Sequence, residues 1–239
     1  MISVAIATMN RWGFLKDTLP LYLASDCVKE VVVCDETGAD AQAIAASPFG
    51  THPKLKVYVN EKRLGIYQNK LKAAAMTTGS WIAVLDSDNV FSSEWFERVQ
   101  SEIDKVQGGK IMFGSPDFDF VNLQEKTSSK PCAEFNGLRL NKGNWNEQFR
   151  KRGMNFLIND GNFVIPRAAL ACLPFDLPSS ATQAADAIYM LKRFLEGGFE
   201  MYYIPQLSYF HLVHPGSTWI QTEKESMAVL NSTDWTIKN

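Results

Sequence analysis

Two acidic residues, Asp86 and Asp88, follow the apolar run "WIAVL" and are separated by one serine, Ser87. Carboxylates this close repel each other unless a positive group lies beside them. In an extended segment, residues i and i+2 project to the same side. Both side chains can then bind one divalent cation, which keeps coordination positions for substrate phosphates. The alternative is a solvated turn in which both aspartates serve as turn and helix-cap residues.

Polar residues also follow two earlier apolar runs. Thr8 and Asn10 come at the end of "ISVAIA", and Asp35 and Glu36 come at the end of "EVVVC". Open parallel sheets bind ligands outside the carboxyl ends of their strands, so we expect these groups to lie near residues 86–88. No G-x-G-x-x-G and no P-loop motif follows the first run, so any phosphates must be neutralised by something other than a glycine-rich helix N-terminus.

The elements that position these residues alternate along the first half of the chain. We expect strands at 2–8, 30–35, 55–60, 81–86 and 110–115, and helices at 12–24, 68–78 and 92–107, with an Ala-rich segment at 40–46. Ser92 and Ser93 are cap candidates for the last of these helices. Short β-branched runs that alternate with helices predict βαβ units around a mostly parallel sheet.

The second half is less regular. No hydrophobic period is visible from 116 to 154, and irregular stretches of this length are usually functional or mobile. Strand character returns at 156–170. A capped helix is expected within 180–198, followed in 199–217 by a strand and a loop that contains histidines. We expect one domain, residues 1–239, with a nucleotide-fold first half and an irregular second half.

Composition excludes several classes of protein. Hydrophobic residues make up 46% of the 239-residue chain and charged residues 21%, and the formal net charge is −2. These values are those of an ordinary globular protein. Nucleic acid is not expected as a partner, because neutralising phosphates requires clustered cations, and the chain has no block of lysine or arginine.

The cysteines and apolar segments indicate the compartment. No C-x-x-C pair occurs among Cys27, Cys34, Cys132 and Cys172, so a zinc ribbon or a disulfide scaffold is not expected. Cys34 is interpreted as a buried reduced thiol in an apolar run. No signal peptide and no stretch of ~20 apolar residues is visible. We expect a soluble, cytoplasmic protein, either free or peripheral to a membrane, without a transmembrane segment.

Three segments follow, in order, the motifs of a known family. They are "SVAIATMNR" (3–11), "EVVVCDETGAD" (30–40) and "LGIYQNKLKAAAMTTGSWIAVLDSDN" (64–89). With these motifs the chain resembles the inverting glycosyltransferases of the GT-A fold, in particular family 2, over roughly the first 100 residues. The resemblance implies a mostly parallel central sheet flanked by helices. Residues 1–115 would bind the nucleotide sugar and a metal, and 116–239 the acceptor.

The resemblance also implies a reaction and a donor site. A sugar would pass, with inversion, from a UDP-, GDP- or dTDP-linked donor to a hydroxyl of a glycan or another acceptor. The implied nucleotide-sugar-binding residues are Ala7, Thr8, Asn10, Arg11, Asp35, Glu36, Gly65, Asn69, Asp86, Ser87, Asp88 and Asn162. The family pattern D-D-G-S reads Asp35-Glu36-Thr37-Gly38 here. Either acid is therefore a candidate acceptor for a base N–H, and the identity of the base stays open.

A metal shell and a catalytic base complete the implied site. Asp88 and Asp86 would hold Mn²⁺ or Mg²⁺ together with a late histidine. His214, which precedes "PGST", fits the family pattern better than His211. Asp186, in "AADAIYMLKRFLEGG", would be the general base on the acceptor hydroxyl. Asp186 can also be interpreted as a first-turn acid stabilised by the helix macrodipole. Asp160 is the next candidate base.

Two alternative functions remain at this stage. A sugar nucleotidyltransferase shares the nucleotide fold but usually carries a glycine-rich basic loop after the first strand, and "TMNRWGFLKD" lacks one. A non-catalytic sugar-binding relative would keep the pocket without turnover. Donor transfer that depends on metal and on Asp186 separates these alternatives.

Overall fold

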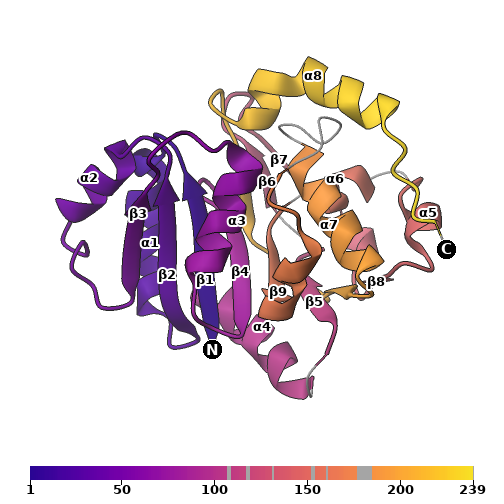
Figure 1. Cartoon of the computed structure of the whole chain (residues 1–239), viewed down its shortest axis with the longest axis horizontal. Coiled ribbons are helices and arrows are strands. Elements are labelled where there is room, and N and C mark those ends of the chain that lie inside the picture. The colour runs from indigo at the N-terminus through magenta and orange to yellow at the C-terminus, as the bar shows by residue number, and fades with distance from the viewer. Residues whose placement is uncertain are drawn as a thin grey trace. The chain divides into compact units, whose positions relative to one another are not determined.

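The structure is a computed structural model that describes residues 1–106, 109–116, 119–130, 132–151, 154–159, 161–176 and 185–238. The chain forms two compact units (Figure 1). The first comprises Met1–Gly109 and Asn162–Arg167, and the second comprises Lys110–Gly161 and Ala168–Asn239. The first unit thus runs to Gly109 and also contains residues 162–167.

The first unit contains a sheet with strand order β3-β2-β1-β4-β9. The strands are β1 (Ile2–Thr8), β2 (Val28–Asp35), β3 (Leu55–Val59), β4 (Trp81–Asp86) and β9 (Phe163–Pro166). The first four run parallel, and β9 pairs antiparallel with β4. The mostly parallel α/β sheet predicted from the sequence is confirmed, and β1 and β4 have the predicted bounds.

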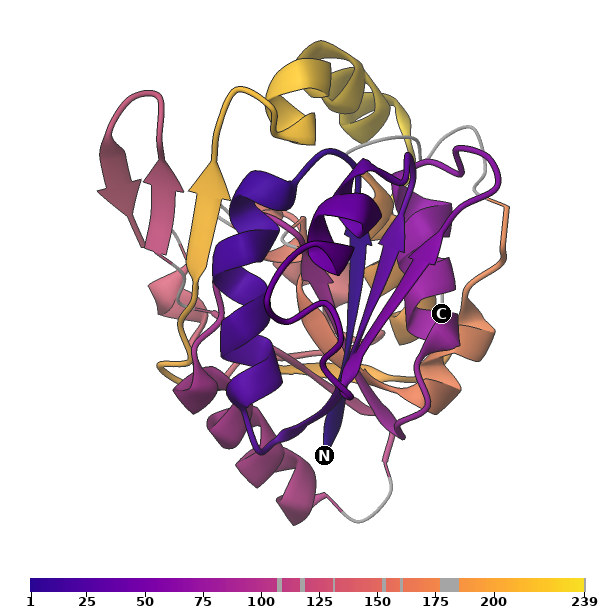
Figure 2. The ribbon, with the colours of Figure 1, turned by 90° about the vertical axis from the view of Figure 1, so that its left-hand side faces the viewer.

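Helices cover both faces of this sheet, which is why β1 and β4 are almost wholly buried apolar runs. These helices are α1 (Trp12–Ala24), α2 (Ala39–Ala45), α3 (Ile66–Met76) and α4 (Ser93–Lys105). Figure 2 shows the strands with α1 on one side and α3 on the other. Helix α3 packs against β1 and β2, and α1 packs against β2 and α4.

Helix α4 shows how local sequence fixes an element. The Ser92 hydroxyl accepts a hydrogen bond of 3.2 Å from the Trp95 N–H, which confirms Ser92 as the N-cap. Trp95, Phe96 and Val99 are buried on one face of the helix. Phe96 meets the Tyr22 ring of α1 edge-on at 5.5 Å, so aromatic packing holds the two helices together.

A buried carboxylate, Glu30, ties the amino ends of the parallel strands together. It accepts hydrogen bonds from the Ser3 hydroxyl at 2.8 Å, from the Lys56 ammonium at 2.6 Å, and from the N–H and hydroxyl of Thr78. Burial would raise the pKa of Glu30, but the hydrogen bonds from Lys56, Thr78 and Ser3 outweigh it and lower the pKa to about 2. The ionised Glu30 carboxylate therefore links the amino ends of these strands through its hydrogen bonds.

The second unit contains two groups of paired strands. One has the order β5-β10-β8, formed by Ile111–Gly114, Glu200–Tyr203 and Arg139–Leu140. The other is three-stranded, β11-β6-β7, formed by Phe210–Val213, Asp119–Asn122 and Thr127–Ser129. The helices are α5 (Trp145–Gln148), α6 (Met154–Ile158), α7 (Asp186–Glu196) and α8 (Thr218–Ser232), with 3₁₀ turns at Ala133–Phe135 and Arg167–Cys172. The stretch without a hydrophobic period is thus built from short elements that pair with distant strands.

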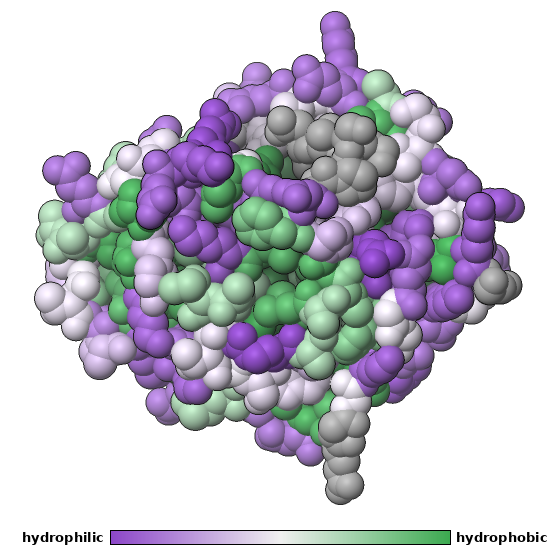
Figure 3. Space-filling view, in the orientation of Figure 1, coloured by the Kyte–Doolittle hydropathy of each residue, from purple (hydrophilic) through white to green (hydrophobic). Residues whose placement is uncertain are grey.

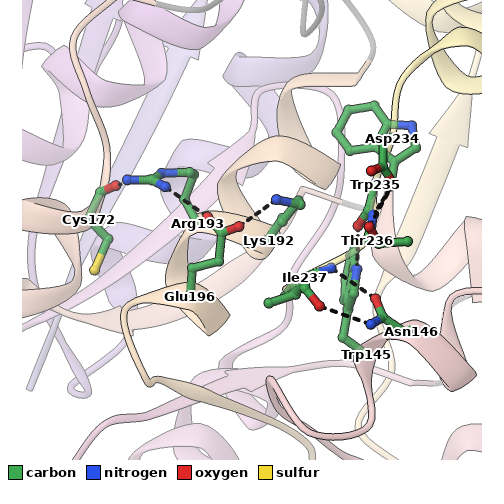
Figure 4. A network of polar contacts seen from close by, with 10 residues as sticks. All are labelled: Trp145, Asn146, Cys172, Lys192, Arg193, Glu196, Asp234, Trp235, Thr236 and Ile237. Carbon is green, nitrogen blue, oxygen red and sulfur yellow. Dashed lines mark hydrogen bonds and ion pairs between the residues drawn. The ribbon is translucent and has the colours of Figure 1, made fainter. Parts of the chain in front are cut away.

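The C-terminal segment of the second unit is bound to helix α5 (Figure 4). The Asn146 side chain donates to the Ile237 carbonyl at 3.0 Å and accepts from the Ile237 N–H at 2.9 Å. The Trp145 indole N–H donates to the Trp235 carbonyl at 2.7 Å. Trp145, Trp235 and Ile237 are buried, so this segment belongs to the core of its unit.

On the face seen in Figure 3, hydrophilic residues lie in many separate places, with hydrophobic residues between them. This distribution agrees with the balanced composition of the chain. Across the part of the chain that the structure describes, we find no helix with the length and apolar character needed to span a bilayer.

Candidate active site

The predicted polar groups meet at the carboxyl edge of the first unit's sheet. In the strand register, Ala7 lies opposite Asp86 of β4, and Thr8 lies opposite Asp35 of β2. The Glu36 N–H donates to the Thr8 carbonyl at 3.0 Å, which extends the pairing beyond the strand ends. The expectation that three strand ends bring these side chains together is therefore confirmed.

Asp40 supports this edge from below, and sequence reasoning gave it no role. Its carboxylate accepts a hydrogen bond of 2.6 Å from the Thr8 hydroxyl. It also accepts hydrogen bonds of 2.8 Å from the Arg11 N–H and from the Trp12 N–H. The N-cap residue of α1, Arg11, makes no side-chain cap bond of its own, so Asp40 caps α1 from another segment. The sequence feature that could have indicated this role is the position of Asp40 as the final residue of the family motif "EVVVCDETGAD".

Asn10 forms the corner between β1 and α1. Its φ of 57° lies in the left-handed region that asparagine tolerates better than most residues. The Thr37 hydroxyl donates to the Asn10 side-chain oxygen at 3.2 Å, and Asn10 is exposed. Asn10 and the partly exposed Arg11 therefore sit at the surface of the site, where a ligand can reach them.

The two candidate base-reading acids each hold a loop. Asp35 is fully buried, and its oxygens accept from the Thr37 N–H at 3.0 Å and the Ala41 N–H at 2.9 Å. Glu36 accepts from the Leu64 and Gly65 N–H groups, both at 2.8 Å. Any contact of either carboxylate with a base must therefore be shared with these backbone bonds.

Gly65 and Asn69 have structural duties in the same loop and helix. Gly65 has φ 86° and ψ 167°, a conformation that is essentially restricted to glycine. Asn69 is 2% exposed; its side chain donates to the Cys34 carbonyl at 3.0 Å and accepts from Asn60 at 2.9 Å. Asn69 thus ties α3 to β2 under the site. Cys34 is a free, buried thiol, as predicted.

The D-S-D segment does not continue the strand. Strand β4 ends at Asp86, and Ser87 and Asp88 lie in a turn in which the Asn89 N–H donates to the Asp86 carbonyl at 3.4 Å. The expectation that Asp86 and Asp88 share an extended segment is therefore wrong. The Tyr22 hydroxyl donates to the Asn89 carbonyl at 3.0 Å, and this contact from α1 fixes the turn.

The positive group beside Asp86 is Lys70 of helix α3. Its ammonium lies 2.9 Å from Asp86 Oδ1. Asn162 completes the arrangement: its amide donates to Asp86 Oδ2 at 3.3 Å and its oxygen accepts from the Asp86 N–H at 2.8 Å. Sequence reasoning missed Lys70, although it placed Asn162 at the site. Both oxygens of Asp86 thus have protein partners.

The part of the chain that the structure describes contains no group of three or more His, Cys, Asp or Glu side chains arranged to hold a metal by themselves. Asp88 is partly exposed at the end of β4, while the Asp86 carboxylate is engaged by Lys70 and Asn162. This donor set fits a hard cation that takes one protein carboxylate and completes its shell with phosphate oxygens and water.

Both candidate histidines belong to the second unit. We expected them in one loop, but His211 lies in β11, because β11 pairs parallel with β6. The His211 ring stacks on Phe120 at 5.6 Å and 12°. His211 Nδ1 lies 3.1 Å from the Tyr209 hydroxyl, and either group can be the donor, depending on the tautomer of the imidazole.

His214 has a different hydrogen-bond pattern. Its Nδ1 accepts from the Gly216 N–H at 3.1 Å, and its own N–H donates to the Ser217 hydroxyl at 3.0 Å. A neutral imidazole that accepts at Nδ1 carries its proton on Nε2. The two histidines therefore differ in the partner of Nδ1, which is the Tyr209 hydroxyl for His211 and the Gly216 N–H for His214.

Asp186 is the first residue of α7 and is 5% exposed. The helix N-terminus favours the charged carboxylate through its macrodipole. The N-cap, Ala185, makes no side-chain cap bond. The predicted helix start near Ser180 and the alternative base Asp160 lie outside the described residues. Asp186 therefore occupies the first-turn position that the sequence predicted.

A separate cavity of about 480 Å³ lies in the second unit. It is lined by Lys192, Arg193, Glu196, Asp234, Thr236 and Lys238. Glu196 pairs with both Lys192 and Arg193, and Asp234 accepts from the Thr236 hydroxyl at 2.7 Å. None of these lining residues is a predicted site residue, so the cavity is not part of the candidate active site.

The fold and the carboxyl-edge groups are those of the GT-A type: a mostly parallel sheet, no glycine-rich phosphate loop, and a D-S-D turn after β4. The sequence profile of glycosyl transferase family 2 matches residues 3–172, and the chain belongs to this family. A search among curated proteins finds no significant match.

Solved structures agree on the fold. S. aureus TarS 1–349 superposes with a TM-score of 0.64 at 14% identity, covering 98% of this chain and 66% of that one. TarS 1–349 in complex with UDP-GlcNAc superposes with a TM-score of 0.66 at 13% identity, covering 91% of this chain and 60% of that one. GalNAc-T7 with UDP, GalNAc and Mn²⁺ superposes with a TM-score of 0.64 at 16% identity, covering 90% of this chain and 44% of that one. The chain thus spans less than two thirds of each of these structures.

Proposed function

We propose that this chain transfers a sugar from a nucleotide-diphospho-sugar to an acceptor hydroxyl, with the help of a divalent cation and with inversion at the anomeric carbon. The observation that carries the proposal is the meeting of Thr8, the Asp35–Glu36 pair and the D-S-D turn at one sheet edge in a family 2 chain. The TarS complexes with UDP and UDP-GlcNAc favour a UDP-linked donor.

The donor half of the mechanism assigns recognition to the first unit. The base and ribose lie along Ala7, Thr8, Asn10 and Arg11, against the loop that Glu36 holds. The diphosphate lies toward the D-S-D turn. Asp88 would hold the cation, and His211 or His214 is the further candidate ligand. When bound, the cation neutralises the charge that grows on the departing diphosphate. The Mn²⁺ in the GalNAc-T7 structure supports this choice of ion.

The acceptor half assigns proton transfer to Asp186. The acceptor oxygen attacks the anomeric carbon and forms the new glycosidic bond. The bond from that carbon to the diphosphate oxygen breaks, and its electron pair leaves with the nucleoside diphosphate. The acceptor proton passes to the Asp186 carboxylate, for which a modest pKa suffices because the proton leaves as the bond forms. Attack opposite the leaving group inverts the anomeric centre.

The proposal is tested by thermal unfolding in the presence of UDP, GDP, dTDP and their sugar conjugates, with and without Mn²⁺ or Mg²⁺. A ligand that binds only the folded protein must raise its stability, by about 2.7 kcal/mol at 100 times its Kd. We expect a metal-dependent rise with one nucleotide and slow release of that nucleoside diphosphate from its sugar conjugate. No rise with any of these compounds contradicts the proposal.

Two further assays separate the alternative functions. A nucleotidyltransferase releases pyrophosphate from a nucleoside triphosphate and a sugar 1-phosphate, so pyrophosphate release overturns the transferase assignment. A binding relative shows the stability rise but no nucleotide release from the sugar conjugate under any metal condition.

A further inference from the structure

The pair formed by Lys70 and Asp86 is unusual for a cation on a surface helix. Lys70 is 8% exposed, whereas lysine is almost never buried unless it is paired. Its ammonium lies 2.9 Å from Asp86 Oδ1, and Asn162 occupies Oδ2. Helix α3 packs against β4, so Lys70 reaches the strand end from within the fold.

This arrangement changes what the D-S-D turn offers to a cation. The charge of Asp86 is already balanced, and a metal ion that approached its carboxylate would meet the ammonium of Lys70. Two positive charges repel strongly at such short range in a partly buried site. Only Asp88 then remains of the motif as a metal-binding carboxylate, and one carboxylate with water holds a divalent cation weakly.

We propose that Lys70 keeps the D-S-D turn from binding a divalent cation on its own, so that the cation enters only together with the donor diphosphate. Lys70 acts as a positioning residue: it holds Asp86 against Asn162 and away from the metal. The inference rests on the proposed function for the identity of the diphosphate. Its central claim concerns the metal affinity of the nucleotide-free protein.

The test is a titration of the nucleotide-free protein with Mn²⁺. The free ion is measured by its electron paramagnetic resonance signal. For the wild type we expect no saturable binding up to ~1 mM, because a single carboxylate is offered. Lys70→Met removes the competing ammonium and releases Asp86, so we expect Mn²⁺ affinity to rise at least ~10-fold, the usual scale of outer-shell effects.

Matched variants separate position from charge. Lys70→Arg keeps a cation beside Asp86 and should behave as the wild type. Lys72→Met removes a positive charge two residues away on the same helix. The ammonium of Lys72 contacts Asn60 rather than Asp86. It should leave Mn²⁺ affinity within about 2-fold, since a longer-range charge is screened. Lys70→Met combined with Asp86→Asn should lose the gained affinity.

Several outcomes overturn the inference. Saturable Mn²⁺ binding by the nucleotide-free wild type, as tight as in the presence of UDP, does so without any variant. An unchanged affinity in a folded Lys70→Met protein does so as well, as does an equal gain in Lys72→Met. Circular dichroism and melting temperature establish folding, and if Lys70→Met does not fold, Lys70→Gln replaces it.

The proposed function fails by a different result, because it requires metal-dependent binding of a nucleoside diphosphate. If no nucleotide binds to any variant, the Mn²⁺ titrations of the nucleotide-free proteins still decide the role of Lys70.

Discussion

The carboxylate of Asp40 accepts a hydrogen bond of 2.6 Å from the hydroxyl of Thr8, the last residue of β1. The same carboxylate binds the N–H groups that open α1, so one acid joins the start of α2 to the corner where Thr8, Asn10 and Arg11 lie. The position of these donor-side residues therefore depends on a buried residue that the sequence motifs leave without a role.

Asp40→Asn should loosen this corner. The amide keeps the size of the side chain but loses the charge and one acceptor, so part of the hydrogen bonding to Thr8 and α1 is lost. We expect a loss of about 1–3 kcal/mol in the free energy of unfolding, measured in urea, and ~10-fold weaker nucleotide binding by calorimetry. Asp17→Asn, at an exposed position of α1, is the control. Equal behaviour of the two variants contradicts the role of Asp40.

Glu36→Gln tests what the carboxylate after β2 does. Both of its oxygens accept from the N–H groups of Leu64 and Gly65, so the amide can keep only one of these bonds. If the acid acts through this loop, the affinities for UDP, GDP and dTDP should fall by a similar factor. A selective loss for one nucleotide would instead assign base recognition to Glu36. The measurement is the Kd of each nucleotide in the presence of Mn²⁺.

Asp186→Asn tests the catalytic base. The amide keeps the shape of the side chain but removes the proton acceptor, so kcat should fall by ~10²–10⁴-fold. The Kd of the nucleotide should stay within about 2-fold, because Asp186 contacts the acceptor rather than the donor in the proposed mechanism. Nuclear magnetic resonance of the wild-type product reports its anomeric configuration. Retention would rule out single displacement, and near-normal turnover of the variant would move the base elsewhere.

The two histidines should contribute unequally to the metal site. His211 Nδ1 can donate to the Tyr209 hydroxyl or accept from it, so its ring can take either tautomer, whereas His214 already accepts at Nδ1 from Gly216. We expect His211→Ala to raise the Kd of Mn²⁺, in the presence of UDP, more than His214→Ala does. The opposite order would restore the preference that the sequence pattern gave to His214.

Glu30 should make stability depend on pH. Its pKa is about 2 in the folded protein and near 4.5 when unfolded, so its contribution is full above pH 4.5 and is lost as the pH falls toward 2. We expect Glu30 to contribute about 2 kcal/mol to the free energy of unfolding. This is less than the full pKa shift would give, because the interaction with the partly exposed Lys56 is screened by solvent. Urea unfolding at pH 6 and pH 3 should show a smaller difference for Glu30→Gln than for wild type. Glu94→Gln, at an exposed site, should not reduce the difference.

The elements that the sequence predicted well are those with uninterrupted local signals. Strands β1 and β4 and helix α1 have the expected bounds, because apolar runs that end in polar residues leave little choice of register. The carboxyl-edge site followed from these elements alone, since parallel strands must end at the same edge.

The features that the sequence did not predict depend on distant partners. Lys70 lies in "NKLKAAA", where a lysine on a helix normally faces water, and its burial depends on Asp86 sixteen positions later in the chain. In the same way, β11 was interpreted as a loop because its partner β6 lies far upstream and is only a short strand. Pairing of this kind leaves no periodic trace in a single short segment.

Strand β9 has a consequence for synthesis of the protein. The first unit needs Phe163–Pro166 to cover the free edge of β4 and needs Asn162 to hold Asp86, yet these residues leave the ribosome after the whole of segment 110–161. During that interval the nascent chain carries "WIAVLD" as an apolar edge strand with unpaired backbone groups, which favours pairing with other chains. A chain stalled at residue 109 should therefore expose the β4 edge to chaperones, whereas in a chain extended past residue 167 strand β9 can cover that edge.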